Sequence, residues 1–539
     1  MPSSESEKAF VRGEAKKFWR EGEYNVWFST LSIGGILLMA LTLLVVVTIN
    51  GLGAFWPSKL ALIKLKEGTT YLGEIEQTSR QPNSKEQRIQ VKIGNRDLYS
   101  LDFKWINLDE VESITYPEEV IALEREEYGN FYGFLKEVHS PDLASGASGL
   151  EAIWGLGDQA KTNLSKLSAE LRAQAEEMES IRLRRLDLAY KNPQSPRLAG
   201  LDKTLAEMGV VFETQVSAQE QAAVESQAHY ALFADAGGRE KEIPLVKIHR
   251  FYYPNQMSLP AKLGHYAVRI YELFFTEPRE SNTEGGLFPA IVGTVILVFT
   301  MSFVSFPLGV VAAVYMREYA RKGVMVQAVR VAVNNLAGIP SIVWGIFGLA
   351  FFIYFVGGGI DAFFFPERLP TPTFGTGGVL WASSTLGLLT VPVVIVATEE
   401  ALGSVPSEIR HGSLALGATQ FQTLMRVVLP MSSPRIMTGF ILAMSRAAGE
   451  VAPLMITGVV KLAPSLPIDL HAPFFHLERK FMHLGFHIYD VGFQSPNVEA
   501  AKPMVFVTTL LLLGVVLLMT SFSIFLRNRM KKRFTGRTF

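Results

Sequence analysis

Cysteine is absent from the 539 residues of this chain, which excludes disulfide bridges, thiolate metal ligands and cysteine nucleophiles. Net charge is absent as well: 51 Lys and Arg balance 51 Asp and Glu, which argues against a nucleic-acid partner. The motifs G-x-x-x-x-G-K-[ST], H-E-x-x-H and G-x-S-x-G are also missing. We therefore expect a protein that is not an enzyme, that does not hydrolyse ATP and that has no cofactor.

Apolar residues are abundant. They make up 48% of the chain, and the mean hydropathy is +0.22, yet 19% of residues are charged. This mixture indicates a membrane part and a polar part on one chain. Six segments are apolar over about 20 residues, the length that crosses a bilayer. They are Phe28–Ile49, Leu287–Val314, Val331–Phe355, Val379–Ala397, Ile436–Val459 and Met504–Leu526. The first lacks a small-x-small cleavage site, so we expect an anchor and not a signal peptide.

Lys and Arg are concentrated in four regions that flank these segments. They are Lys8, Arg12, Lys16, Lys17 and Arg20; Arg317, Arg321, Lys322 and Arg330; Arg410, Arg426 and Arg435; and Arg527, Arg529, Lys531, Lys532, Arg533 and Arg537. With six spans, all four regions fall on one side of the membrane, and the segment 357–378 on the other side carries Arg368 alone. We expect both termini in the cytoplasm and residues 51–285 outside it.

The polar stretch after the first span begins with strand signals. Thr69–Ile75, Arg88–Ile93 and Leu98–Phe103 are predicted strands, and Gly94-Asn95 is a predicted turn. Near the end of the stretch, a segment that contains Leu263, Tyr266, Ile270 and Leu273 is amphipathic. We expect this last segment at the membrane surface, just before the second span.

The middle of the polar stretch is a predicted helical arm. From Leu150 to Lys191, apolar residues recur at steps of three and four, and Asn192-Pro193 stops the pattern. Gln174 and Arg185 interrupt the apolar seam, so packing on one face competes with a coiled-coil dimer. Two short segments flank the arm at a constant offset of 137: Ile106, Leu108, Val111, Ile114, Tyr116 and Pro117 match Ile243, Leu245, Ile248, Phe251, Tyr253 and Pro254. We interpret the match as a duplicated β unit, with chance agreement of two strands as the alternative.

A polar loop of about 35 residues joins the fourth and fifth spans, which is too long for a simple turn. Gly417 interrupts its core and Leu429-Pro430 closes it. This pattern predicts a helix, a glycine bend and a second helix that Pro430 ends. Pro340 falls inside the third predicted span, where we expect it to kink the helix and open a cavity.

The loop resembles the coupling loop of ABC importer permeases, in which a Gly stands ten residues before an aliphatic-x-Leu-Pro. Here these positions are Gly417, Val427, Leu429 and Pro430. The words ALGAT-x-x-x-T-x-x-x-VVLP and R-A-x-GE-x-APL look like the PstA-type subunit of bacterial phosphate importers. GGLFPAIVGT, PLGVVAAVYMREYA and NLAGIPSIVWGIFGLA extend the resemblance over most of residues 285–526. Ala452-Pro453-Leu454 favours the PstA type over its sister PstC type.

The resemblance implies an all-α membrane domain with six transmembrane helices of the ABC importer type I permease fold, plus an α+β extracytoplasmic insert. The implied parts are a cytoplasmic tail (1–27), a transmembrane anchor (28–50), the insert (51–285), the permease domain (286–526) with its coupling loop (399–433), and a basic cytoplasmic tail (527–539). The location implied is the bacterial inner membrane, with the insert in the periplasm.

The function implied is import of inorganic phosphate by alternating access, with ATP hydrolysed on a partner chain. The implied partners are a PstC-type permease, a PstB-type ATPase dimer, a PstS-type phosphate-binding protein, phosphate and membrane lipid. Residues expected to couple the chain to the ATPase are Glu400, Ala415, Gly417, Ala418, Leu429 and Pro430. The family often has Glu six residues before the glycine, where this chain has His411. Another oxyanion, such as molybdate or sulfate, and a membrane-anchored sensor or scaffold stay as alternatives.

Two charged residues lie inside the fifth predicted span. Arg446 and Glu450 are four residues apart and so share a helix face. Charges near mid-membrane cost a few kcal/mol, so they usually face a polar cavity or each other. We expect Arg446 to meet the oxyanion with its planar fork while Glu450 balances the charge; a structural ion pair is the alternative. Gly449 would let another helix approach.

Four histidines gather in the last outside loop, at His471, His476, His483 and His487. The last two are spaced i and i+4, which is compatible with zinc, but further ligands would be needed. An amphipathic loop helix that carries Phe481, Leu484 and Ile488 is the interpretation we favour, and we predict no metal site.

Overall fold

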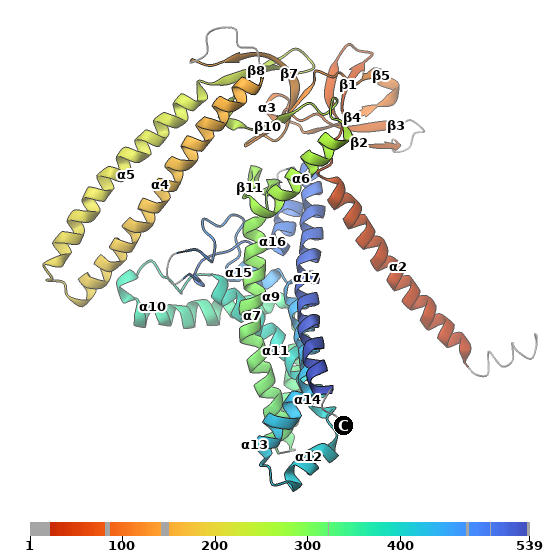
Figure 1. The fold of residues 1–539 in the computed structure, drawn as a ribbon, viewed down its shortest axis with the longest axis vertical. Coiled ribbons are helices and arrows are strands. Elements are labelled where there is room, and N and C mark those ends of the chain that lie inside the picture. The colour runs from red at the N-terminus through yellow and green to blue at the C-terminus, as the bar shows by residue number, and fades with distance from the viewer. Residues whose placement is uncertain are drawn as a thin grey trace, which may run out of the picture.

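The computed structural model describes residues 22–80, 87–141, 150–321, 323–470, 474–495 and 497–535. Long helices run roughly side by side along its vertical axis, and a β-rich part covers one end (Figure 1). The basic residues of the first 20 positions, Lys322, Arg537 and His471 lie outside the described residues.

Within the described residues, six helical segments are long and apolar enough to cross a membrane. They are α2 (Glu23–Gly53); α7 (Phe288–Val314) with η4 (Tyr315–Tyr319); α9 (Ser341–Phe347) with η5 (Gly348–Gly357) and α10 (Gly358–Phe364); α11 (Val379–Gly403); α13 (Gln420–Thr423) with η7 (Leu424–Val428) and α14 (Leu429–Ala447); and α17 (Val498–Thr535). The predicted six-helix membrane domain is confirmed.

Two of the six segments differ from the prediction. In the third, helix α8 (Val324–Leu336) ends before Pro340, and Pro340 precedes α9 in an extended conformation (φ −54°, ψ 134°). Proline disfavours a helical conformation at the residue before it but is well placed at a helix start, so it separates two helices and does not kink one. In the fifth, the helix begins at Gln420 and ends at Ala447, and the short α15 (Ala452–Thr457) follows. The prediction of one helix over Ile436–Val459 is wrong.

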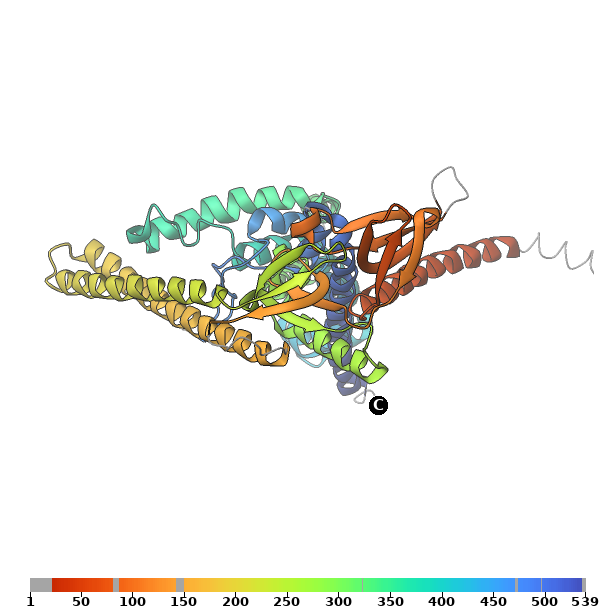
Figure 2. The same ribbon diagram turned by 90° about the horizontal axis from the view of Figure 1, so that it is seen from above.

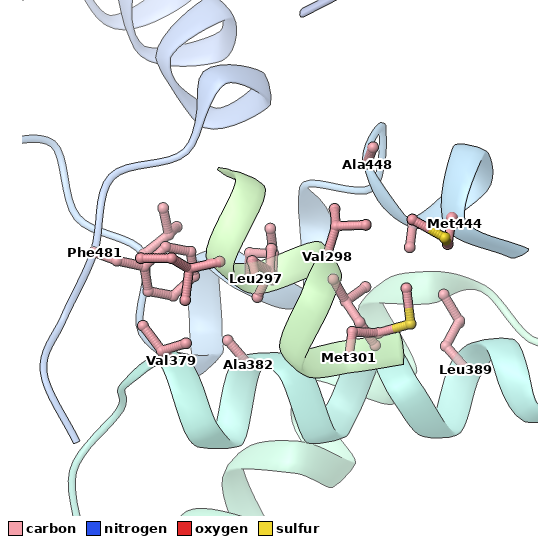
Figure 3. Close-up of a cluster of buried hydrophobic side chains, with 14 of the residues drawn as sticks. Leu297, Val298, Met301, Val379, Ala382, Leu389, Met444, Ala448 and Phe481 are labelled. Atoms are coloured by element: carbon pink, nitrogen blue, oxygen red, sulfur yellow. The ribbon is translucent and has the colours of Figure 1, made fainter. Parts of the chain in front are cut away.

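Helix α11 lies at the centre of the bundle, in contact with α7 and α14. The core contains Leu297, Val298 and Met301 from α7 and Val379, Ala382 and Leu389 from α11, with Met444, Ala448 and Phe481 beside them (Figure 3). Small residues permit this close packing. A Cβ added at Gly439 would lie 2.2 Å from the Cβ of Ala397, so α14 approaches α11 too closely there for any side chain.

Helix α2 contacts the bundle at its end only. A Cβ added at Gly51 would lie 3.1 Å from Leu510 of α17. Towards its beginning the helix diverges from the bundle in both views (Figures 1 and 2), and 6% of its most apolar window is buried. Its apolar side chains are therefore available to lipid or to another subunit.

The insert contains two antiparallel five-stranded sheets. The first has the order β4-β3-β2-β1-β5, from β1 (Leu60–Leu65), β2 (Thr70–Arg80), β3 (Gln87–Lys92), β4 (Phe103–Asn107) and β5 (Val111–Thr115). The second has the order β10-β6-β7-β8-β9, from β6 (Ile121–Arg125), β7 (Phe131–His139), β8 (Tyr230–Ala234), β9 (Glu240–Pro244) and β10 (Ile248–Tyr252). The two sheets have the same topology. When the five strands of each sheet are numbered along the chain, both have the spatial order five, one, two, three, four.

The two sheets agree with the predicted duplication. In each, a single 3₁₀ turn joins the fourth strand to the fifth: η1 (Leu108–Glu110) and η2 (Leu245–Lys247), which lie 137 residues apart. The prediction of a strand over Leu98–Phe103 is wrong, because α3 (Arg96–Tyr99) forms there. Left-handed residues on both sides of α3, at Asn95 (φ 53°) and Ser100 (φ 58°), turn the chain into a helical turn instead. Gly94 and Asn95 are both left-handed (φ 55° and 53°), but the hydrogen-bonded turn begins at Asn95 and leads into α3, with the Leu98 N–H bonded to the Asn95 oxygen.

The arm is a helical hairpin between β7 and β8. Helix α4 (Leu150–Lys191) has the predicted bounds, and the unpredicted α5 (Arg197–Gln227) packs along it. The apolar seam of α4 is therefore covered within the same chain. Arg185, which interrupts the seam, is paired with Asp202 of α5 at 2.9 Å. Near its tip, α4 contacts η6 (Pro366–Arg368) in the loop before α11.

The remaining elements connect the insert to the bundle. They are α6 (Leu259–Phe275), β11 (Pro278–Arg279), η3 (Glu280–Asn282), β12 (Glu284–Gly285), α16 (Leu484–Tyr489) and η8 (Asp490–Gln494). Helix α6 precedes α7, with β11, η3 and β12 between the two helices, and α6 is held to the second sheet by ion pairs. Arg269 donates to Glu124 at 2.8 Å, and Glu272 accepts from Arg250. That α6 lies at a membrane surface stays a prediction.

The ion pairs of α6 give the insert a pH dependence. His249 of β10 lies 3.5 Å from Glu126 and 3.4 Å from Glu272. Burial alone would lower the pKa of His249, but these two carboxylates outweigh burial and the nearby Arg279 and raise it above its ordinary value. Because the folded pKa is raised, this stabilisation is complete below about pH 6.5 and is lost as the pH rises through the folded value.

We predict that the melting temperature of the wild type falls more steeply between pH 6 and pH 9 than that of His249→Gln. Thermal unfolding of the purified chain at several pH values measures the difference. His139→Gln, at an exposed histidine near Glu137, is the matched control and should keep the wild-type slope. Equal slopes for His249→Gln and the wild type would contradict the prediction.

Candidate coupling surface and transport site

The loop between α11 and α14 forms two short helices at the end of the molecule opposite the insert (Figure 1). Helix α12 (Ser407–Ala415) is followed by Gly417 at φ +86° and then by α13. The left-handed conformation at Gly417 is the predicted glycine bend. Thr419 caps α13: its hydroxyl accepts from the Gln422 backbone N–H at 3.2 Å, while the Gln422 side chain accepts from the Thr419 N–H at 3.0 Å.

Polar contacts fix this loop to the ends of α7 and α11. Arg410 of α12 donates to both carboxylate oxygens of Glu318, at 2.5 and 2.7 Å, and to the backbone oxygen of Leu402 at 2.6 Å. Gln420 donates to the backbone oxygen of Glu318 at 2.8 Å. The hydroxyls of Ser413 and Thr423 meet across the bend at 2.9 Å. A force on the two short helices therefore passes to both α7 and α11.

Four apolar side chains of the loop are left exposed. Leu416 at the bend is 91% exposed, and Leu414, Phe421 and Met425 are 44–61% exposed. Below them, a buried cluster of Leu402, Val405, Leu424 and Val428 supports the loop. Exposed apolar residues on a rigidly supported element are typical of a surface that binds another protein.

The predicted coupling residues occupy different positions on this element. Glu400 is exposed in the last turn of α11, Ala415 is exposed at the end of α12, and Ala418 is half-buried beside the bend. Leu429 packs against the buried cluster that supports the loop. His411, at the position where the family often has Glu, is exposed on α12.

Pro430 does not end a helix, which corrects the prediction. The helix continues from α13 through the π turn η7 into α14, and the Leu429 N–H bonds to the Leu424 oxygen five residues back. This wider turn comes directly before the proline, so Pro430 lies in the first turn of α14, where a missing N–H is tolerated.

Arg446 and Glu450 lie where the fifth span breaks. Helix α14 ends at Ala447, and Glu450 follows in a turn in which its N–H bonds to the Ala447 oxygen at 3.2 Å. Arg446 Nε lies 3.5 Å from Glu450 Oε1, with 44% and 21% of the two side chains exposed. The pair therefore bridges the end of a helix. The prediction that the two residues share one helix face is wrong, because the helix ends between them. Gly449 has no close neighbour: its Cβ would meet only the Arg446 oxygen, at 3.7 Å.

A second helix break lies next to the first. The chain is non-helical between α8 and α9, at 337–340, and α9 then packs against α15. A Cβ added at Gly345 of α9 would lie 2.8 Å from the Cα of Pro453 in α15. One at Gly348 would lie 2.2 Å from the hydroxyl of Thr385 in α11. The helices that follow the two breaks thus pack on each other and on the central helix. Broken helices at a protein-lined position are typical of transport sites.

Three of the four clustered histidines, His476, His483 and His487, lie in the described part of the chain, where they make other contacts. His483 Nδ1 accepts from the Gly485 N–H at 3.1 Å, and His487 Nδ1 lies 3.1 Å from the Thr508 hydroxyl. Burial lowers the pKa of both imidazoles to about 4, so both are neutral at pH 7. No group of three His, Cys, Asp or Glu that could hold a metal ion occurs in the described part of the chain. His476 instead lies between Asp469 (3.0 Å) and Glu478 (3.3 Å), an arrangement that the sequence did not reveal.

These features define a multi-pass membrane protein with two short, hydrogen-bonded helices at one end and interrupted helices in its bundle. Residues 305–532 match the family described as the binding-protein-dependent transport system inner membrane component. The chain is 32% identical over 223 residues to the probable ABC transporter permease protein YqgI of Bacillus subtilis, a match that covers 40% of this chain and 70% of that protein. The chain belongs to this family and is a permease subunit of an ABC importer.

Two further similarities involve a phosphate permease and a solved structure. The chain is 32% identical over 217 residues to the phosphate transport system permease protein PstA of Mycobacterium leprae, covering 40% of this chain and 65% of that protein. Among solved structures, the inward-facing MetNI methionine ABC transporter gives a TM-score of 0.32 at 18% identity, covering 46% of this chain and 95% of that chain. Residues 60–275 of the insert precede the matched family segment.

The contact between α9 and α15 gives a direct test of the paired breaks. We predict that Gly345→Ala lowers the unfolding free energy by about 1–3 kcal/mol, because its methyl group has no room beside Pro453. Gly358→Ala, in α10, has nothing within 4 Å of the new methyl group and is the matched control. Thermal unfolding in detergent measures both. A loss of the same size in the two variants would show that α9 and α15 are not in close contact.

Proposed function

We propose that this chain is a PstA-type permease subunit that imports inorganic phosphate. The family membership, the relatives named as phosphate permeases and the arginine at the break of the fifth span support the proposal. ATP is hydrolysed on a partner chain, and ATP binding there shifts the membrane domain between inward-open and outward-open states.

The observation that carries the proposal is the state of the Arg446 side chain. Its Nε pairs with Glu450, while its two Nη groups have no partner among the described residues, and close to half of the side chain is exposed. A guanidinium with a free edge can donate two parallel hydrogen bonds to a tetrahedral oxyanion. Glu450 keeps the arginine oriented and lowers the net charge at the site, so that the anion is bound weakly enough to be released.

The coupling surface supports the partners and the sidedness that we propose. The apolar side chains around Gly417 dock in a groove of a PstB-type ATPase subunit, and Glu400, Ala415, Ala418, Leu429 and Pro430 shape that contact. The contacts of Arg410 then transmit the movement of the ATPase subunit to α7 and α11. Because the insert lies at the opposite end, it is periplasmic, both termini are cytoplasmic, and a PstC-type permease and a PstS-type binding protein complete the importer.

Phosphate uptake tests the substrate. In cells that lack their own permease but hold the other subunits, the wild type restores uptake and Arg446→Gln lowers it by about 10–100-fold, the cost of losing charge-assisted hydrogen bonds. Arg435→Gln, exposed on the same helix, is the control and keeps wild-type uptake. Unchanged uptake in Arg446→Gln would show that the Arg446–Glu450 pair contributes only to helix packing. Uptake of molybdate or sulfate, but not of phosphate, by the wild type would transfer the proposal to that oxyanion.

ATPase coupling tests the other end of the molecule. We expect Leu416→Asp to abolish co-purification of the ATPase subunits and uptake together, because a carboxylate replaces the most exposed apolar side chain of the loop. Leu416→Met, which keeps an apolar side chain of similar volume, should retain both. Co-purification and uptake of Leu416→Asp at wild-type levels would contradict this role for the bend.

A further inference from the structure

A polar cavity of about 390 Å³ lies between the insert and the membrane bundle. Its upper side is formed by the first sheet, through Glu76, Gln90 and Lys92. Its lower side is formed by the end of α2 and the beginning of α17, through Asn50, Lys502 and Phe506. The volume falls within the range of about 300–1,000 Å³ that is usual for small-molecule sites. The Arg446–Glu450 pair and the coupling loop share no residue with its lining.

The cavity lies at the insert-facing ends of two candidate membrane spans. It is bounded by the last residues of the first candidate span, Tyr24–Gly53, and the first residues of the last one, Val498–Lys532. Directly after α2, the ring of Trp56 packs against that of Tyr266 with centroids 6.0 Å apart, and Trp56 is 40% exposed. Exposed tryptophan and tyrosine at helix ends are typical of the membrane–water interface.

Two opposite charges in this cavity have no partner at hydrogen-bond distance in the described chain. The ammonium of Lys92 and the carboxylate of Glu76 form no hydrogen bond or ion pair with each other or with the rest of the described chain. Glu499 and Lys502, by contrast, are paired at 3.4 Å, and Glu499 also accepts from Gln90. The unpaired charges are one of each sign, so the cavity is suited to a ligand that carries both a cation and an anion.

Burial and the neighbouring charges shift the pKa of both groups. Burial opposes the charge on Lys92, but Glu74, Glu284, Glu76 and Asp102 outweigh it and raise its pKa, so the amine stays protonated. Burial raises the pKa of Glu76, with Lys92 acting in the opposite direction. A phosphate group near the half-buried Lys92 and an ammonium near the exposed Glu76 would give each charge a partner at hydrogen-bond distance.

The path from the cavity into the bilayer is apolar. Helices α2 and α17 touch at Gly51 and diverge away from the insert in both views (Figures 1 and 2). Ile49 and Phe506 line the cavity where this divergence begins. Acyl chains would lie along these two helices while the headgroup occupies the cavity, a combination that a soluble ion does not require.

We propose that this cavity binds the headgroup of a zwitterionic, amine-bearing phospholipid of the phosphatidylethanolamine class. The acyl chains of the lipid fill the wedge, which is the space between the diverging helices α2 and α17. Its headgroup in the cavity joins the insert to the ends of these two helices. The proposal rests on the membrane location of the family and is independent of which anion the importer carries.

Native mass spectrometry of the full chain, purified with its partner subunits and stripped of lipid, tests the site. Phosphatidylethanolamine added back should bind the wild type, and Lys92→Met should weaken that binding by about tenfold. Glu76→Gln, an exposed and nearly isosteric change, should weaken it similarly and guards against misfolding of the first variant. Lys64→Met is the control: Lys64 lies on the same sheet but pairs with Glu112 at 2.9 Å, outside the cavity.

The other outcomes are equally clear. Equal binding by the two cavity variants and the control would overturn the proposal, as would equal binding of phosphatidylglycerol, which has no ammonium. Binding of soluble phosphoethanolamine as tight as that of the lipid would show a site for a free small molecule, and would overturn the lipid assignment. Lipid bound by the isolated chain but excluded from the assembled importer would assign the wedge to a helix of the partner permease.

Discussion

Hydrocarbon offers no partner for a free backbone N–H or C=O, and the membrane part of this chain depends on that constraint. A helix can break inside the bilayer only where protein covers the ends. Here the breaks at 337–340 and 448–451 lie side by side, and α9, α15 and α11 pack together around them. Glycines at positions 345 and 348 make this packing possible, because no side chain fits there. The helices that follow the two breaks thus depend on one close contact, in which α9 and α15 pack on each other and on α11.

The two ends of the molecule are joined to this junction in different ways. On one end, Arg410 connects the loop helices to α7 and α11, the two helices that form the centre of the bundle. On the other end, the insert is joined mainly to α17: Asn497 donates to Asp102, and Gln90 donates to Glu499. The two attachments reach different helices, and the packing of the bundle is what relates one to the other.

Local patterns predicted some elements well. The arm helix α4 begins and ends at the predicted residues, because a continuous seam and an Asn-Pro stop are local signals. Helix α5 was not predicted, although Leu198, Leu201, Leu205 and Met208 carry the same spacing. The duplicated turn was visible in sequence because both copies keep the same length between strands.

What depended on distant contacts could not be predicted. The spacing of Arg446 and Glu450 indicated that they would meet, but only the packing of α9 on α15 explains why the helix ends between them. Pro430 was assigned as a helix end because the π turn that accommodates it has no sequence signature. The cavity around Lys92 could not be predicted either, because part of its lower side comes from residues some 400 positions later in the chain.

The arm turns small rotations of the insert into large displacements. Its α4 has 42 residues and is therefore about 60 Å long, with its beginning at the second sheet and its end at the η6 loop. For a rigid rod of that length, a rotation of about 5° at the sheet moves the tip by about 5 Å, close to one helical turn. A small tilt of the insert therefore produces a large displacement at the loop before α11, and the two packed helices of the hairpin transmit force in both directions.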